Sequence, residues 1–238
     1  MSAHFAIPAT TFVLRAIIEA RLKAAYGTFT PPPVSINPPA RPTSASGPAP
    51  PEPPGLVLFL HHAGPNPAWR NMHDPHVDSA GIPQSRPPLV LDLHYMLAAQ
   101  GPDLEREALL GIGMSALHRN GIVPRKIIAG ILGPILVPAT PTKLIDTLTK
   151  EPLDKQPESI SISQQPVDID LSTKLWSSLQ SPLRPSAFYL ATTVFLDTGE
   201  PEEEGAAVTA VQLFARPAVE PAPTAAGEPD AVITEPLP

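Results

Sequence analysis

The apolar residues near the start of the chain recur every three or four positions, as they do on one face of an α-helix. Between residues 10 and 26 this apolar line consists of Leu14, Ile18, Leu22 and Ala25. Charged residues form a neighbouring line, and Gly27 follows at a position where helices often end. The pattern predicts an amphipathic helix over residues 10–26 that forms part of the core.

Two later segments have the short apolar runs that are typical of strands. The first, residues 56–60, is bounded by glycine and by Gly64-Pro65, which predicts a buried strand. In the second, residues 89–95, the odd-numbered positions are apolar, whereas Asp92 and His94 lie on the opposite face. We expect one face of this second strand to lie in the core and the other to be partly polar.

Helices and strands alternate along the rest of the chain. A helix is expected over 104–119, with Asp103 as its N-cap and with a close packing contact at Gly111 and Gly113. Another helix, capped by Asp170 or Ser172, should run through residue 180. Shorter helices are expected at 126–132 and 142–150, and strands at 159–163, 187–196 and 208–214. This order predicts a mixed α/β or α+β fold.

Proline divides the chain into ordered and extended parts. There are 35 prolines, about three times the usual share, and 11 of them lie between residues 31 and 54, too many for a helix or a paired strand. From residue 216 onward, prolines and acidic residues leave little apolar material, which predicts an arm that orders on a partner. We therefore expect an N-terminal helix (1–30), a linker or loop (31–54), an α/β domain (55–198) and a C-terminal strand and tail (199–238).

Composition excludes several classes of function. A net charge of −7 and scattered basic residues give no surface for nucleic acid. The absence of cysteine excludes disulfides and cysteine-based metal or catalytic sites. The N-terminus lacks the features of a signal peptide, and the longest apolar run, residues 127–137, is too short to span a bilayer. We expect synthesis and assembly in the cytoplasm, with no membrane insertion.

Two catalytic or metal-binding interpretations can be drawn from the polar residues. Histidines and an aspartate gather between residues 60 and 76, but adjacent His61 and His62 should point to opposite faces of a strand instead of converging on one ion. Asp92 and His94 could form an acid–base pair with Ser186 as a distant nucleophile, although no glycine-rich elbow surrounds any serine. A polar interface explains the Asp92 and His94 face better, and we expect no cofactor, metal site or catalysis.

Four sequence blocks say more about the function than the candidate catalytic and metal-binding residues do. The first, LVLFLHHAGPNPAWRN, runs from a strand into a turn that contains Pro65, Asn66, Arg70 and Asn71. The second, PPLVLDLHYMLAAQG, contains Asp92, His94 and Tyr95. The third, ALLGIGMSALH, is a helix with a Leu-Gly pair at Gly111 and a Leu-His end. The fourth, LSTKLWSSLQSPLRPSAFYLATTVFLD, joins a Lys-Leu-Trp helix to a strand and contains Trp176, Arg184, Ser186 and Tyr189.

In their residues and in their order along the chain, these blocks resemble the cap, or tail-terminator, proteins of extracellular contractile injection systems of the antifeeding-prophage type. The resemblance implies a tail-terminator-like α/β domain without enzymatic activity. It implies a homo-oligomeric ring, of six subunits, that ends the inner tube and engages the last sheath layer of a released or membrane-attached particle. The motif residues would then be interface candidates. An adaptor that joins a baseplate or membrane anchor to the tube is the alternative.

Overall fold

The structure is a computed structural model that describes residues 5–39, 52–69, 89–134 and 159–196, together with two short strands at 210–214 and 232–236. The chain divides into two compact units. The first contains the described helices and a five-stranded sheet, and the second contains the two short strands, which pair with each other. None of the described helices is long and apolar enough to cross a membrane.

The sheet of the first unit has the strand order β1-β2-β3-β5-β4. Its strands are β1 Val34–Ser35, β2 Gly55–Pro65, β3 Leu89–Gln100, β4 Ser161–Gln165 and β5 Ser186–Leu196. β1 runs parallel to β2, and all other neighbours are antiparallel. The three long strands therefore form the centre of the sheet, and the two short strands lie at its edges.

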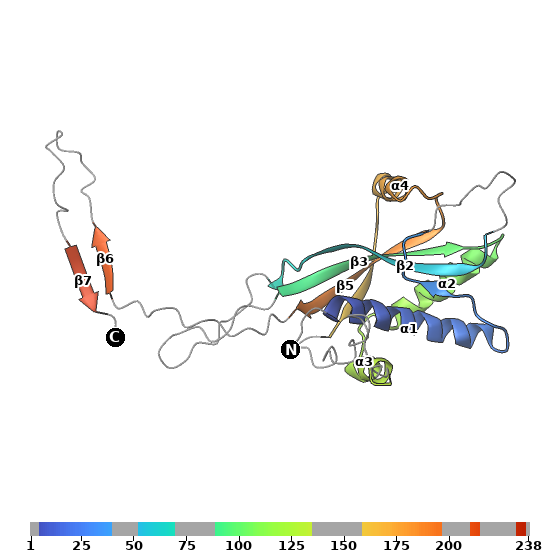
Figure 1. Ribbon diagram of the computed structural model, residues 1–238, viewed down its shortest axis with the longest axis horizontal. Helices are drawn as coiled ribbons and strands as arrows, with labels where there is room; N and C mark the ends of the chain where they lie inside the picture. The colour runs from blue at the N-terminus through green and yellow to red at the C-terminus, as the bar shows by residue number, and fades with distance from the viewer. Residues whose placement is uncertain are drawn as a thin grey trace, which may run out of the picture. The chain divides into compact units, whose positions relative to one another are not determined.

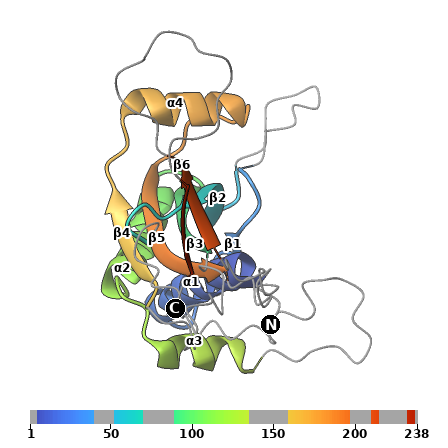
Figure 2. The same ribbon diagram turned by 90° about the vertical axis from the view of Figure 1, so that its left-hand side faces the viewer.

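Helices cover the two faces of the sheet unequally (Figures 1 and 2). One face packs against α1 Ala6–Tyr26, α2 Glu105–Arg119 and α3 Arg125–Leu132, and we call it the three-helix face. Among the described helices, the other face packs against α4 Ile169–Ser178 only, and we call it the α4 face. One short helix covers only part of a sheet with three long strands, so part of the α4 face carries the polar residues of β2 and β3.

The core follows from the alternation of side chains along β3. Leu93, Tyr95 and Leu97 are fully buried on the three-helix face, as the sequence pattern predicts. Met96 and Ala98 point the other way and pack against Trp176 of α4. Each large apolar side chain buried in this way contributes about 1.5–3 kcal/mol to folding.

The predicted mixed α/β fold class is confirmed, as are most of the predicted elements. The first helix begins at Ala6 and ends at Tyr26, where Gly27 adopts a positive φ of 58°. Leu14, Ile18 and Leu22 are buried, but Ala25 is exposed, so the apolar line ends one turn early. The predicted strands of the first unit are present but longer or shifted by one or two residues at their ends. The helix expected at 142–150 lies outside the described residues.

The proline-rich segment contains a short paired strand that its composition does not predict. Val34 and Ser35 pair with Leu56 and Val57 of β2, and Val34 is buried. The expectation that this segment is too rich in proline to pair is therefore wrong at these two positions. Neither position is a proline, so both keep the main-chain N–H that a ladder needs. Residues 40–51 lie outside the described part.

The side-chain caps predicted for two helices are wrong. α2 begins at Glu105 without a side-chain cap, because Asp103 adopts a turn conformation with a φ of 44°. α4 begins at Ile169, also without a side-chain cap. Asp170 lies inside its first turn, where it accepts a 2.6 Å hydrogen bond from Lys174 one turn later.

The second unit contains β6 Ala210–Phe214 and β7 Val232–Pro236, which pair antiparallel. β6 corresponds to the strand expected at 208–214. The expectation that the chain after residue 216 orders only on a partner is wrong for β7, because this strand pairs within the chain.

Candidate interaction site

A hydrogen-bonded turn at the end of β2 joins the first and second sequence blocks. The side chain of Asn66, next to Pro65, donates from Nδ2 to Asp92 Oδ1 at 2.7 Å. Its Oδ1 accepts from the main-chain N–H groups of Ala68 and Trp69, at 2.9 and 3.2 Å. Asn66 is 8% exposed, so this side chain shapes the turn. Arg70 and Asn71, the other candidates of this block, lie outside the described residues.

A β-bulge brings three histidines together on the α4 face. The register of β2 against β3 shifts between Leu60 and His62, which makes His61 the extra residue of β2. The ring centroids of His61 and His62 lie 6.1 and 5.1 Å from that of His94. The prediction that His61 and His62 point to opposite faces is therefore wrong, because the bulge interrupts the alternation of side chains.

Burial and neighbouring histidines disfavour protonation of His61 and His94. Burial lowers the pKa of His61, and His94 and His62 lower it further. Burial and His62 lower the pKa of His94, against a smaller opposing effect from Asp92. Within the described ranges, no group of three or more His, Asp or Glu side chains is arranged to hold a metal ion. The remaining members of the histidine-rich segment, His73, Asp74 and His76, lie outside those ranges.

The geometry of β3 and β5 excludes the hydrolase triad considered from the sequence. Ser186 pairs with Ala98, whereas His94 pairs with Leu190. Ser186 thus lies four residues along the ladder from His94, a separation of about 13 Å. Asp92 is engaged with Asn66. Ser186 therefore cannot act as the nucleophile of this pair.

Arg184 anchors the end of the proline-rich segment to the start of β5. Its Nε donates to both carboxylate oxygens of Glu52, at 3.0 and 3.1 Å, and its Nη2 donates to Glu52 Oε1 at 2.5 Å. Nη1 donates to Ser181 Oγ at 2.6 Å, and the guanidinium lies 5.8 Å from the ring centre of Trp176. Arg184 is 8% exposed and Trp176 2% exposed. This pair of motif residues therefore holds α4 and the linker in place.

Two further motif residues have contrasting environments. Tyr95 is fully buried, and its hydroxyl shares a 2.8 Å hydrogen bond with Thr11 of α1. Burial raises the pKa of Tyr95 well above its usual range, so its hydroxyl stays protonated. Gly111 lies on the exposed side of α2 with open space around it, whereas Gly113 faces Leu97 and Leu56 at close range. The predicted close contact thus exists at Gly113 and is wrong at Gly111.

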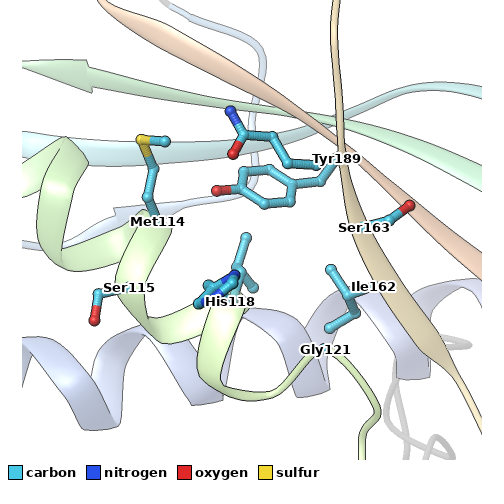
Figure 3. A pocket seen from close by; sticks show the side chains of 9 residues that line it. Met114, Ser115, His118, Gly121, Ile162, Ser163 and Tyr189 are labelled. Atoms are coloured by element: carbon cyan, nitrogen blue, oxygen red, sulfur yellow. The ribbon is translucent and has the colours of Figure 1, made fainter.

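Tyr189 lies beside a pocket of about 570 Å³ between α2 and β4. Figure 3 shows its ring lying across the pocket, with the hydroxyl directed toward the helix that carries Met114 and His118. Burial raises the pKa of Tyr189, so this hydroxyl is a neutral donor or acceptor. The pocket combines apolar walls with a few polar groups, and its lining residues are Met114, Ser115, Leu117, His118, Gly121, Ile162, Ser163, Gln164 and Tyr189.

Sequence reasoning missed two residues that hold the motif residues in place. Glu52 binds Arg184 across 132 positions, and Thr11 binds Tyr95 across 84. Glu52 is the only acidic residue between residues 31 and 54, a signal that could have identified it as a partner for a buried arginine. Thr11 has no comparable signal, because it is one of several threonines and serines in the N-terminal third.

Fold and site together define the class of protein, which is α/β. Its polar motif residues hold a turn, the helix α4 and the linker against one five-stranded sheet. The chain belongs to the family of the Pvc16 N-terminal domain, whose model matches residues 9–210. The family relationship predicted from the four blocks is confirmed. No curated protein matches the chain.

Two solved structures show a distant likeness. One is described as the sheath/tube terminator, in the extended state, of the extracellular contractile injection system PVC; it is 16% identical with a TM-score of 0.49, over 88% of this chain and 64% of that chain. The other is described as the anti-feeding prophage cap, the AFP tube terminating cap; it is 13% identical with a TM-score of 0.47, over 84% and 59%. The chain spans less than two thirds of the length of either.

Proposed function

We propose that the protein is a structural cap, or terminator, subunit of a phage-tail-like contractile injection system. It would form a ring of six subunits that ends the inner tube and anchors the last sheath layer. The observation that carries this proposal is membership of the Pvc16 N-terminal domain family over residues 9–210, together with four motif blocks in the family order. The particle would assemble in the cytoplasm and be released or membrane-attached.

The site geometry supports a scaffold role for the motif residues. Asn66 and Asp92 fix a turn at the end of β2, and Arg184 fixes α4 and the linker through Glu52. Such contacts keep a surface rigid for a neighbouring subunit, as a closed assembly requires. We place the subunit and sheath contacts on the α4 face near Asp92 and His94, beside the part that α4 covers, and at the Tyr189 pocket.

Tube length tests the cap proposal. Particles assembled without the protein should have overlong or unstable tubes with a broad length distribution, and supplying the wild-type chain should restore a uniform length. The control is Lys23→Ala, which removes an exposed charge in the last turn of α1, outside all four motif blocks. That variant should restore tube length fully. Tubes of normal length and stability without the protein would overturn the proposal.

An adaptor function is the second candidate, because the uncovered part of the α4 face could equally receive a baseplate or anchor component. In that case particles without the protein would have tubes of normal length but would lack the adapted component. Mass spectrometry of purified particles, with and without the chain, distinguishes the two functions.

A further inference from the structure

Within the described residues, the sheet of the first unit has an open edge along β2. β1 covers only Leu56 and Val57, where Leu56 donates its N–H to the Pro33 carbonyl. β2 continues for eight more residues, and no other described strand pairs with it on that side. Because main-chain groups alternate between the two edges of a strand, Leu60 presents its N–H and carbonyl to the same open side as Leu56.

A groove of about 320 Å³ lies at this edge, where Phe59 and Leu60 of β2 face Ile7 and Phe12 of α1. Consecutive residues of a strand point to opposite faces, so a groove that both Phe59 and Leu60 line must extend around the edge of the strand. Ile36, just after β1, also lines this groove and is 46% exposed. The open edge of β2 therefore combines unpaired main-chain groups with exposed apolar surface.

β4 forms a second open edge at the other end of the sheet. Its first half is covered, because Ile162 donates its N–H to the Gly121 carbonyl at 2.6 Å. Gln164, two residues further on, presents its N–H and carbonyl to the same side, where no described residue pairs with them. Ile122, beside this edge, is 68% exposed. The Tyr189 pocket also reaches the edge, because consecutive residues Ile162, Ser163 and Gln164 all line it.

We propose that the β4 edge of one copy pairs with the β2 edge of the next copy, so that the sheets join head to tail around the ring. This inference rests on the proposed function, which requires copies of the chain to close a ring. Unpaired strand edges are covered most readily by another strand, and the described part of each copy carries two, at opposite ends of one sheet. Pairing β4 with β4 would stop at a dimer and leave both β2 edges open, whereas head-to-tail pairing uses every edge.

The strand directions fit this contact. β2 is antiparallel to β3, β3 to β5 and β5 to β4, so β4 and β2 run in opposite directions within one copy. Copies related by rotation about an axis parallel to the strands keep these directions, so β4 meets the next β2 as an antiparallel pair. The contact would also bury Ile122, which bridges to Ser161 of β4, and Ile36, which lines the groove beside β2.

Cross-linking tests the contact directly, because the chain contains no cysteine. The double variant Ala63→Cys, Gln164→Cys places one thiol on each open edge. Treated with a short bis-maleimide, it should give a ladder of covalent multimers, whereas a mixture of the two single variants should give covalent dimers only. The matched control, Ala63→Cys with Lys174→Cys, places its second thiol on the exposed side of α4 and should stay monomeric. Cross-linking of Gln164→Cys to itself, or no excess over the control, would overturn the proposal.

A proline substitution provides an independent readout. Gln164→Pro removes an N–H that faces the neighbouring copy and that no described residue accepts within one copy, whereas Gln164→Ala keeps it. Losing one hydrogen bond should weaken each contact about fivefold to tenfold, seen as a shift from rings to smaller species by native mass spectrometry. Both variants should keep the thermal midpoint of the monomer to within a few degrees. Rings of equal stability in the two variants would contradict the proposal.

The outcomes separate this inference from the cap function. If labelled particles carry the chain at the tube end but the edge thiols do not cross-link, the edge contact is wrong and the cap function stands. If purified protein cross-links head to tail but is absent from the tube end, the edge contact stands and the cap function is wrong.

Discussion

Two glycines of α2 provide a matched test of how closely this helix approaches the sheet. A Cβ at Gly113 would lie 3.0 Å from Leu97 Cδ2 and 3.2 Å from Leu56 Cδ1, whereas a Cβ at Gly111 would meet nothing within 4 Å. Alanine in place of a mid-helix glycine contributes about 0.5–1 kcal/mol through backbone entropy. At Gly113 this gain is opposed by about 1–3 kcal/mol of overpacking, because both leucines are buried in a dense core.

We therefore expect Gly111→Ala to raise the free energy of unfolding by about 0.5–1 kcal/mol and Gly113→Ala to lower it by up to about 2 kcal/mol. In a protein of this size, 1 kcal/mol corresponds to about 2–4 °C in Tm. Urea denaturation of both variants measures the difference, provided that the slopes agree. If Gly113→Ala stabilises the protein as much as Gly111→Ala, then the side chains of Leu97 and Leu56 move aside at no cost in free energy. The close contact would then not constrain α2.

Three further predictions concern polar groups of the first unit. Glu52→Gln and Arg184→Lys should each lower the free energy of unfolding by about 1–2 kcal/mol in chemical denaturation, because neither variant keeps the forked ion pair; a loss in only one would contradict a shared role. Tyr95→Phe should cost about 1 kcal/mol in the same assay, since the hydrogen bond between Tyr95 and Thr11 is lost, and an unchanged midpoint would argue against that hydrogen bond. The pKa of His61 is lowered in the folded state, so the unfolded chain takes up the proton first as the pH falls below about 6.5. Stability should therefore decline from that pH down to the folded pKa, and His61→Asn should reduce the slope in Tm measured against pH; an equal slope would show that other groups cause it.

The sequence predicted the parts of the fold that depend on periodic burial. Alternation along β3 correctly indicated that Tyr95 faces the core and that Asp92 and His94 lie opposite. The spacing of Leu14, Ile18 and Leu22 correctly indicated the buried face of α1. These predictions held because the period of a helix or strand fixes which side chains share a face, wherever the element is placed in the fold.

The bulge at His61 could not be predicted in this way, because one extra residue reverses the alternation without changing the local sequence pattern. The pairing of Val34 with β2 was missed for a related reason. A two-residue edge strand depends on its neighbour and not on its own apolar pattern.

The candidate site, too, could be predicted from the sequence only in part. The sequence blocks identified Arg184 and Asn66 correctly as special positions, but their partners depend on tertiary packing. Glu52 meets Arg184 only because the linker ends beside the start of β5. The open edges of β2 and β4 likewise depend on the order of strands in the sheet, which no single segment encodes.

The position of the chain on an assembled particle tests the cap function most directly. Gold labelling of a tag on the full chain, followed by electron microscopy of intact particles, should place the label at one end of the tube, opposite the baseplate. Averaged end views should show six-fold symmetry. Label at the baseplate, along the sheath or absent from particles would contradict the cap function.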